Sequence, residues 1–205
     1  MQITKTPVII YAESTPNPAA MKFVANRLLV ENNATVEYTD APQAKASPLA
    51  TKLFSFPFVK GIFMTANFIT LTKNDSINWE DVIHELREFI QNYLSDENPV
   101  FSSTPQQTQS KEQTEIAHNI PTMHSEPSSD VEFRIIEILE EYIRPAVEQD
   151  GGAIYFQSLK DGVVTVALKG ACSGCPSSTI TLKAGIEGLL KRMIPEVREV
   201  VAEAL

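Results

Sequence analysis

The sequence predicts an α+β fold made of two small domains, residues 1–97 and 129–205, joined by a flexible linker over residues 98–128. Three observations support this prediction. Short alternating apolar runs and one long helical pattern fill the first segment, Ser, Thr, Gln, Pro and His dominate the second, and the third follows the order α-β-β-loop-α-β. A chain of 205 residues is long enough to bury two modest cores.

In the first domain, strands are expected where apolar residues alternate with polar ones. These stretches are 8–14, 21–26, 34–39, 61–66 and 68–72. The segment 15–18 (TPNP) separates the first two strands, because its two prolines fix φ and lack an amide donor. The last two strands are expected to form a hairpin that turns near Asn67.

Two helices are expected in the same domain, after a loop at residues 40–47. The first begins at Pro48, with Ser47 as its cap, and ends before Pro57. The second follows the candidate cap Asn78 and runs to the end of the domain. Its apolar residues recur every three or four positions: Trp79, Val82, Ile83, Leu86, Phe89, Ile90 and Tyr93.

The segment 98–128 holds few apolar residues, and they follow no period. Such a segment buries too little surface to offset the entropy lost on ordering. We therefore interpret it as a linker.

The second domain opens with a possible capping box between Ser129 and Glu132, followed by a helix with a broad apolar face. Pro145 is expected to end or kink this helix, and 150–152 forms a turn. The residues of the apolar face are Ile135, Ile136, Ile138, Leu139, Tyr142 and Ile143.

Two strands follow, at 153–159 and 163–168, and 160–162 (KDG) between them is a strong hairpin signal. A helix over 179–193 and a closing strand over 197–201 complete the domain. That helix carries apolar residues at helical spacing: Ile180, Leu182, Ile186, Leu189, Leu190 and Met193.

Composition narrows the classes of function. The net charge is -9, and no cluster of Lys and Arg stands out, which disfavours binding to nucleic acid or to anionic lipid. Two cysteines do not make a secreted disulfide scaffold, and no apolar run reaches the length of a membrane span. The N-terminal residues lack the features of a signal or transit peptide, so we expect a cytoplasmic protein with no membrane or nucleic-acid partner.

Both cysteines, Cys172 and Cys175, lie in the loop that enters the last helix. Amide groups at a helix N-terminus favour thiolate, the form of cysteine that binds metals and attacks disulfides. Gly170 and Gly174 allow tight turns and leave amides able to donate to sulfur, and Pro176 suits a first helical turn. The loop therefore has the features of a chelating corner.

Such a pair can share a metal or cluster, form a reversible disulfide, or have no chemical role. A 4Fe–4S cluster or a structural zinc usually takes four ligands, and a homodimer would supply them as two facing cysteine pairs. We interpret His84 as a solvated residue rather than a ligand, and the linker residues His118 and His124 likewise. A thioredoxin-like enzyme would carry the pair after an early strand, whereas here it follows a hairpin late in the chain.

The second domain resembles the C-terminal domain of NifU, the Nfu-type domain. The resemblance rests on Arg144-Pro145, on DGG at 150–152, on LKGACSGCPSST at 168–179, on TLKAGIE at 181–187 and on IPEV at 194–197. The first domain resembles the N-terminal domain of Nfu-type proteins, through TPNP at 15–18, KF at 22–23, SPLA at 47–50, LF at 53–54, FIT at 68–70 and WE at 79–80. Two positions depart from the family's usual pattern, Ala153 and Phe58, and neither is a ligand position.

The resemblance implies an iron–sulfur cluster scaffold or carrier that is not an enzyme. It would bind a 4Fe–4S cluster through Cys172 and Cys175, usually between two subunits, and pass it to apo-proteins after receiving or assembling it with upstream proteins. From the residues themselves, a thiol–disulfide redox protein or a zinc-bridged structural dimer stay open as alternatives.

Overall fold

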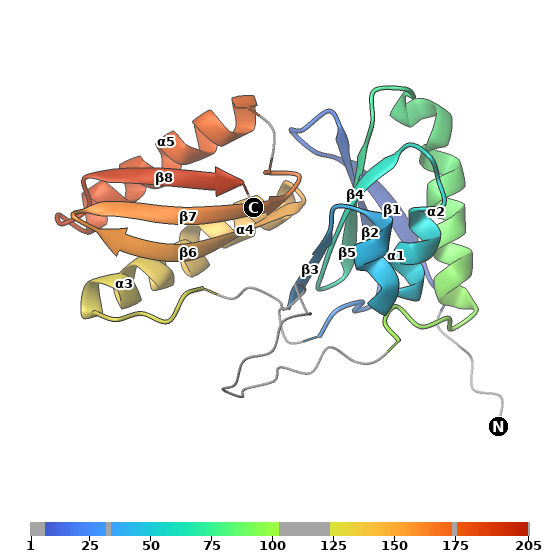
Figure 1. Ribbon diagram of the computed structural model, residues 1–205, viewed down its shortest axis with the longest axis horizontal. Coiled ribbons are helices and arrows are strands. Elements are labelled where there is room, and N and C mark those ends of the chain that lie inside the picture. The colour runs from blue at the N-terminus through green and yellow to red at the C-terminus, as the bar shows by residue number, and fades with distance from the viewer. Residues whose placement is uncertain (1–6, 32–33, 103–123, 174–175, 205) are drawn as a thin grey trace. The chain divides into compact units, whose positions relative to one another are not determined.

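The computed structural model describes residues 7–31, 34–102, 124–173 and 176–204. The chain divides into two compact units, each with its own sheet (Figure 1). The predicted α+β class with two domains is confirmed. The predicted boundaries at 97/98 and 128/129 stay predictions, because most of the segment 98–128 lies outside the described residues.

The first unit contains a five-stranded sheet in the order β1-β2-β5-β4-β3. Antiparallel pairing joins β3 to β4 and β4 to β5, and Ala66 and Asn67 form the tight turn of the β4–β5 hairpin, as predicted. The strands are β1 (Ile10–Ser14), β2 (Ala20–Ala25), β3 (Thr35–Tyr38), β4 (Val59–Thr65) and β5 (Phe68–Lys73).

Helices α1 (Pro48–Leu53) and α2 (Trp79–Ser95) lie against this sheet (Figure 1). The Ser47 hydroxyl caps α1 by accepting from the Ala50 amide, as its position before Pro48 predicts. The expected loop at 40–47 instead contains a 3-10 helix, η1 (Ala41–Ala46), because the Asp40 carboxylate accepts from the Gln43 amide and organises the turn.

The second unit has the predicted order α-β-β-α-β around a three-stranded sheet, β6-β7-β8. β6 (Gly152–Lys160) and β7 (Val163–Gly170) form an antiparallel hairpin, and β8 (Glu199–Ala204) pairs in parallel with β7. The closing strand begins two residues later than predicted because Arg198 and Glu199 first donate their amides to the Gly162 carbonyl.

Three helices cover one face of this sheet, because their buried residues join a single core with alternate residues of the strands. They are α3 (Asp130–Ile138), α4 (Arg144–Gln149) and α5 (Pro176–Met193). The core includes Ile135, Val147, Ile154, Phe156, Val164, Val166, Ile186, Leu190 and Val200. Ile180, expected on the apolar face of α5, is 70% exposed.

Pro145 does not end the helical segment that opens the second unit, but the segment is irregular just before it. A single π turn, η2 (Leu139–Ile143), stands between α3 and α4, and the Arg144 amide donates to the Leu139 carbonyl five residues earlier. Proline has no amide to donate, so the widened turn accommodates Pro145 within a continuous helical segment.

Candidate metal centre

The loop that carries the cysteines begins where the β6–β7 hairpin ends. Gly152 opens β6 and pairs in register with Gly170, the last residue of β7. Gly170 has φ 67°, a left-handed conformation that suits glycine, and it turns the chain out of the sheet. Cys172 therefore lies two residues beyond the end of β7, and the hairpin sets the direction in which the loop leaves the sheet.

Backbone hydrogen bonds hold the start of this loop against the hairpin. The Ala171 amide donates to the Gly151 carbonyl at 3.2 Å. The Ser173 amide and hydroxyl both donate to the Gly170 carbonyl, at 3.1 and 2.9 Å. The Ala171 and Ser173 amides are therefore paired with carbonyl oxygens of the hairpin end.

Cys172 lies inside the second unit rather than on its surface. Its residue exposure is 4%, and it belongs to the same buried core as the helices and strands. A Cβ added at Gly152 would lie 2.8 Å from the Cys172 sulfur and 2.6 Å from the Lys169 carbonyl oxygen. The sulfur therefore occupies space that any other residue at position 152 would fill.

The other cysteine, Cys175, lies outside the described residues, as does Gly174. The distance between the two thiols is therefore not part of the structure. Helix α5 begins at Pro176, three residues before the predicted start at residue 179, and Pro176 lies in its first turn as expected. The assignment of Cys172 and Cys175 as ligands stays a prediction.

The three histidines differ in their surroundings. His84 is exposed on α2, as expected, and His118 lies outside the described residues. His124 was expected to be solvated, but only 13% of its side chain is exposed. Its Nδ1 accepts a hydrogen bond of 2.7 Å from the Phe156 amide, and the Ser125 amide donates to the Phe156 carbonyl at 2.9 Å.

His124 therefore belongs to the edge of β6 and not to a solvated linker. Its Nε2 contacts Glu140, which also forms an ion pair with Arg144. Burial raises the pKa of Glu140, but hydrogen bonds and charge from Arg144 and His124 outweigh this effect and hold the pKa below its usual range. Nothing in the polar composition around residue 124 could have indicated this strand-edge contact.

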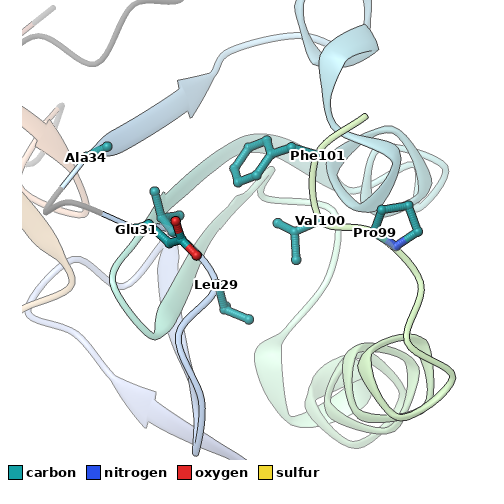
Figure 2. Close-up of a pocket in the computed structure, with 7 residues that line it drawn as sticks. Leu29, Glu31, Ala34, Pro99, Val100 and Phe101 are labelled. Atoms are coloured by element: carbon teal, nitrogen blue, oxygen red, sulfur yellow. The ribbon is translucent and has the colours of Figure 1, made fainter. Parts of the chain in front are cut away.

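The first unit contains a small cavity of about 240 Å³, shown in Figure 2. Its walls come from the segment after β2 and from residues 99–101, and Glu31 is the one ionisable residue among the lining residues that the structure describes. The Tyr93 hydroxyl and the Ser47 hydroxyl donate to the carbonyls of Pro99 and Val100, at 2.8 and 2.6 Å, which holds the second wall in place. These described lining residues include no nucleophile and no cluster of metal ligands. Among the described residues, no three His, Cys, Asp or Glu side chains gather closely enough to hold a metal ion.

The fold and the cysteine loop define a class: a two-domain α+β protein with a paired-cysteine loop at a strand–helix junction. Comparison with protein families specifies it further. Residues 10–97 match the family described as scaffold protein Nfu/NifU N terminal, and residues 135–201 match the NifU-like domain. The chain belongs to the Nfu/NifU scaffold-protein family.

Curated relatives agree with these matches. The chain is 34% identical over 193 residues to the NFU1 iron-sulfur cluster scaffold homolog, mitochondrial, of Drosophila sechellia, covering 94% of this chain and 64% of that protein. It is 34% identical over 198 residues to NifU-like protein 4, mitochondrial, of Arabidopsis thaliana, covering 96% and 66%. The chain thus spans about two thirds of the length of these relatives.

Among solved structures, the chain is similar to the NifU-like protein from Saccharomyces cerevisiae. The identity is 23% and the TM-score 0.42, over 50% of this chain and 92% of that one. None of the described helices combines the length and apolar character that crossing a membrane requires.

Proposed function

We propose that this protein is a scaffold or carrier for a 4Fe–4S cluster, held by Cys172 and Cys175 and delivered to apo-proteins. The observation that carries the proposal is the place of the cysteine loop, which lies between β7 and α5 inside the segment matched by the NifU-like family. Thiolates are soft ligands that suit iron–sulfur clusters. The relatives' names, which describe scaffold proteins, support the same role.

The number of cysteines supports a homodimer. The chain contains two cysteines, whereas a 4Fe–4S cluster usually takes four thiolates. Two chains related by a two-fold axis supply four equivalent ligands without any further residue type. In the proposed complex the cluster bridges the two subunits.

Delivery follows from the same arrangement. A cluster between two subunits is shared and releasable, and transfer is ligand exchange from four carrier thiolates to those of a client protein. The chain itself performs no turnover in this proposal. Its partners are apo iron–sulfur proteins and upstream assembly proteins, without nucleic acid or membrane.

The cytoplasmic location stays a prediction. The names of the Drosophila and Arabidopsis relatives place those proteins in mitochondria. Fractionation of the source cells, with this chain detected by antibody beside matrix and cytosolic markers, decides between the two compartments.

The deciding experiment is anaerobic reconstitution of the full chain with iron and sulfide. We expect a brown protein with about two irons per chain, and a shift from monomer to dimer in size exclusion. Single Cys172→Ser and Cys175→Ser variants should lose stable cluster binding while their far-UV circular dichroism matches the unaltered chain.

Other outcomes point to other functions. A variant lacking one cysteine that still holds a full cluster would contradict the ligand assignment. A colourless dimer with one zinc per two chains would indicate the zinc-bridged alternative. A metal-free monomer whose dithiol titrates with a defined potential would indicate the redox alternative.

A further inference from the structure

The side chain of Cys172 takes the place that a side chain at position 152 would occupy. A Cβ at Gly152 would lie 2.8 Å from the Cys172 sulfur and 3.1 Å from its Cβ. Carbon atoms at such positions do not approach below about 3.0 Å without something moving, because overlap of electron shells is steeply repulsive. The absent side chain of Gly152 therefore leaves a space that holds the sulfur, which we call the thiol seat.

Backbone atoms and hydrogen bonds hold the thiol seat in shape. The Lys169 carbonyl oxygen would lie 2.6 Å from the added Cβ, so the backbone of β7 bounds the seat on another side. Hydrogen bonds from Ala171 and Ser173 to the hairpin end fix the chain on both sides of Cys172. The seated cysteine joins the apolar core, and its exposure is only 4%.

The seated sulfur cannot at the same time be a ligand shared with a second chain. Iron must bond directly to the sulfur, and a cluster between two subunits approaches each of them from its surface. In the proposed carrier, Cys172 therefore needs two exclusive states, the seated one that the structure shows and one turned out toward the cluster. Anything that stabilises the seated state lowers the apparent affinity for the cluster, because only the other state is competent to bind.

We infer that Gly152 is a positioning residue whose thiol seat competes with the cluster for Cys172 and so promotes cluster release. This inference rests on the proposed carrier function and adds a structural reason why the bound cluster is labile. Return of the sulfur to the seat accompanies departure of the cluster, and the seat shields the thiol between deliveries.

The first test needs no cluster. In the full-length Cys175→Ser variant, Cys172 is the only cysteine, since the chain contains two. We expect its alkylation by iodoacetamide, without metal, to be roughly tenfold or more slower in buffer than in concentrated urea. Equal rates in buffer and urea would show that no seat exists and would overturn the inference.

The second test fills the seat. Gly152→Ala, added to Cys175→Ser, should raise the alkylation rate of Cys172 in buffer by roughly tenfold. The matched control is Gly188→Ala on α5, where an added Cβ would meet no described neighbour within 4 Å, and it should leave the rate unchanged. Circular dichroism reports whether the fold is kept. If Gly152→Ala unfolds the chain, the alkylation rates of the Cys175→Ser variant in buffer and in urea still decide whether the seat exists.

The third test concerns the cluster. With both cysteines present, reconstituted Gly152→Ala should lose its cluster to an iron chelator more slowly than the unaltered chain, by roughly the factor seen in alkylation. Faster loss would contradict competition by the seat. If neither protein binds a cluster, the proposed function fails, while the alkylation result still shows whether the seat exists.

Discussion

Glu132 is a charged residue enclosed by the start of α3. It is 8% exposed, and its carboxylate accepts from the Ser128 amide at 2.6 Å and from the Ser128 hydroxyl at 2.7 Å. Its own amide donates to the Ser129 hydroxyl at 3.3 Å, which caps the helix. The predicted capping box thus forms, and the Glu132 carboxylate reaches back mainly to Ser128, the residue before the cap.

These hydrogen bonds make stability depend on pH. The Ser128 hydroxyl and then its amide hold the pKa of Glu132 below its ordinary value, because both donate to the ionised carboxylate. A lowered folded pKa stabilises the fold above the unfolded pKa of about 4.3, and this stabilisation is lost as pH falls through the folded value. We expect Glu132→Gln to cost about 1 kcal/mol at neutral pH and little once the carboxyl is protonated.

Urea unfolding at neutral and at acid pH, followed by circular dichroism, measures this difference. Glu137→Gln provides the control because Glu137 is exposed on the same helix. An equal cost of Glu132→Gln at both pH values would show that the charge of the carboxylate contributes nothing.

At the scale of elements, the turn between β6 and β7 also holds the start of β8, so it contacts all three strands of the second sheet. Gly162 has φ 80°, and its carbonyl accepts from the amides of Arg198 and Glu199 at 2.7 and 3.2 Å. An added Cβ would lie 2.8 Å from the Glu196 carbonyl oxygen. The hairpin turn therefore also sets where β8 begins.

Replacing Gly162 should disturb all three strands together. We expect Gly162→Ala to destabilise the second unit by about 1–3 kcal/mol, because it adds backbone strain and a clash with a carbonyl. Gly188→Ala should instead be neutral or stabilising by up to about 1 kcal/mol, since alanine favours an open helical position. Midpoints of urea unfolding measured by circular dichroism compare the two, and equal midpoints would contradict this role of the turn.

Local chemistry explains which elements could be predicted from the sequence. Asp161-Gly162 supplies the positive φ values of a tight hairpin, and Ser47 before Pro48 supplies a cap, so both features depend on neighbouring residues alone. The period of apolar residues located α2 and α5 for the same reason.

Features that depend on distant residues could not be predicted. His124 looks like any linker histidine until the amide of Phe156 is placed beside it. The burial of Cys172 depends on Gly152, which is twenty residues earlier and becomes a neighbour only through the hairpin register. The cysteine motif indicated thiol chemistry, but its spacing holds no information about the seat.

At the scale of the whole molecule, each unit has its own sheet and core, so we expect each to unfold in its own transition. The chain contains one tryptophan, Trp79, which is half-buried at the start of α2 with the Lys73 amine 5.9 Å from its ring centroid. Its fluorescence reports only the first unit, whereas circular dichroism reports both.

Gly162→Ala should therefore lower the transition of the second unit and leave the Trp79 transition unchanged. Leu86→Ala, at a fully buried position of α2, should do the reverse and cost about 2–5 kcal/mol in the first unit. If either variant moves both transitions together, the two units are coupled in stability, and a client bound to one would then alter the other.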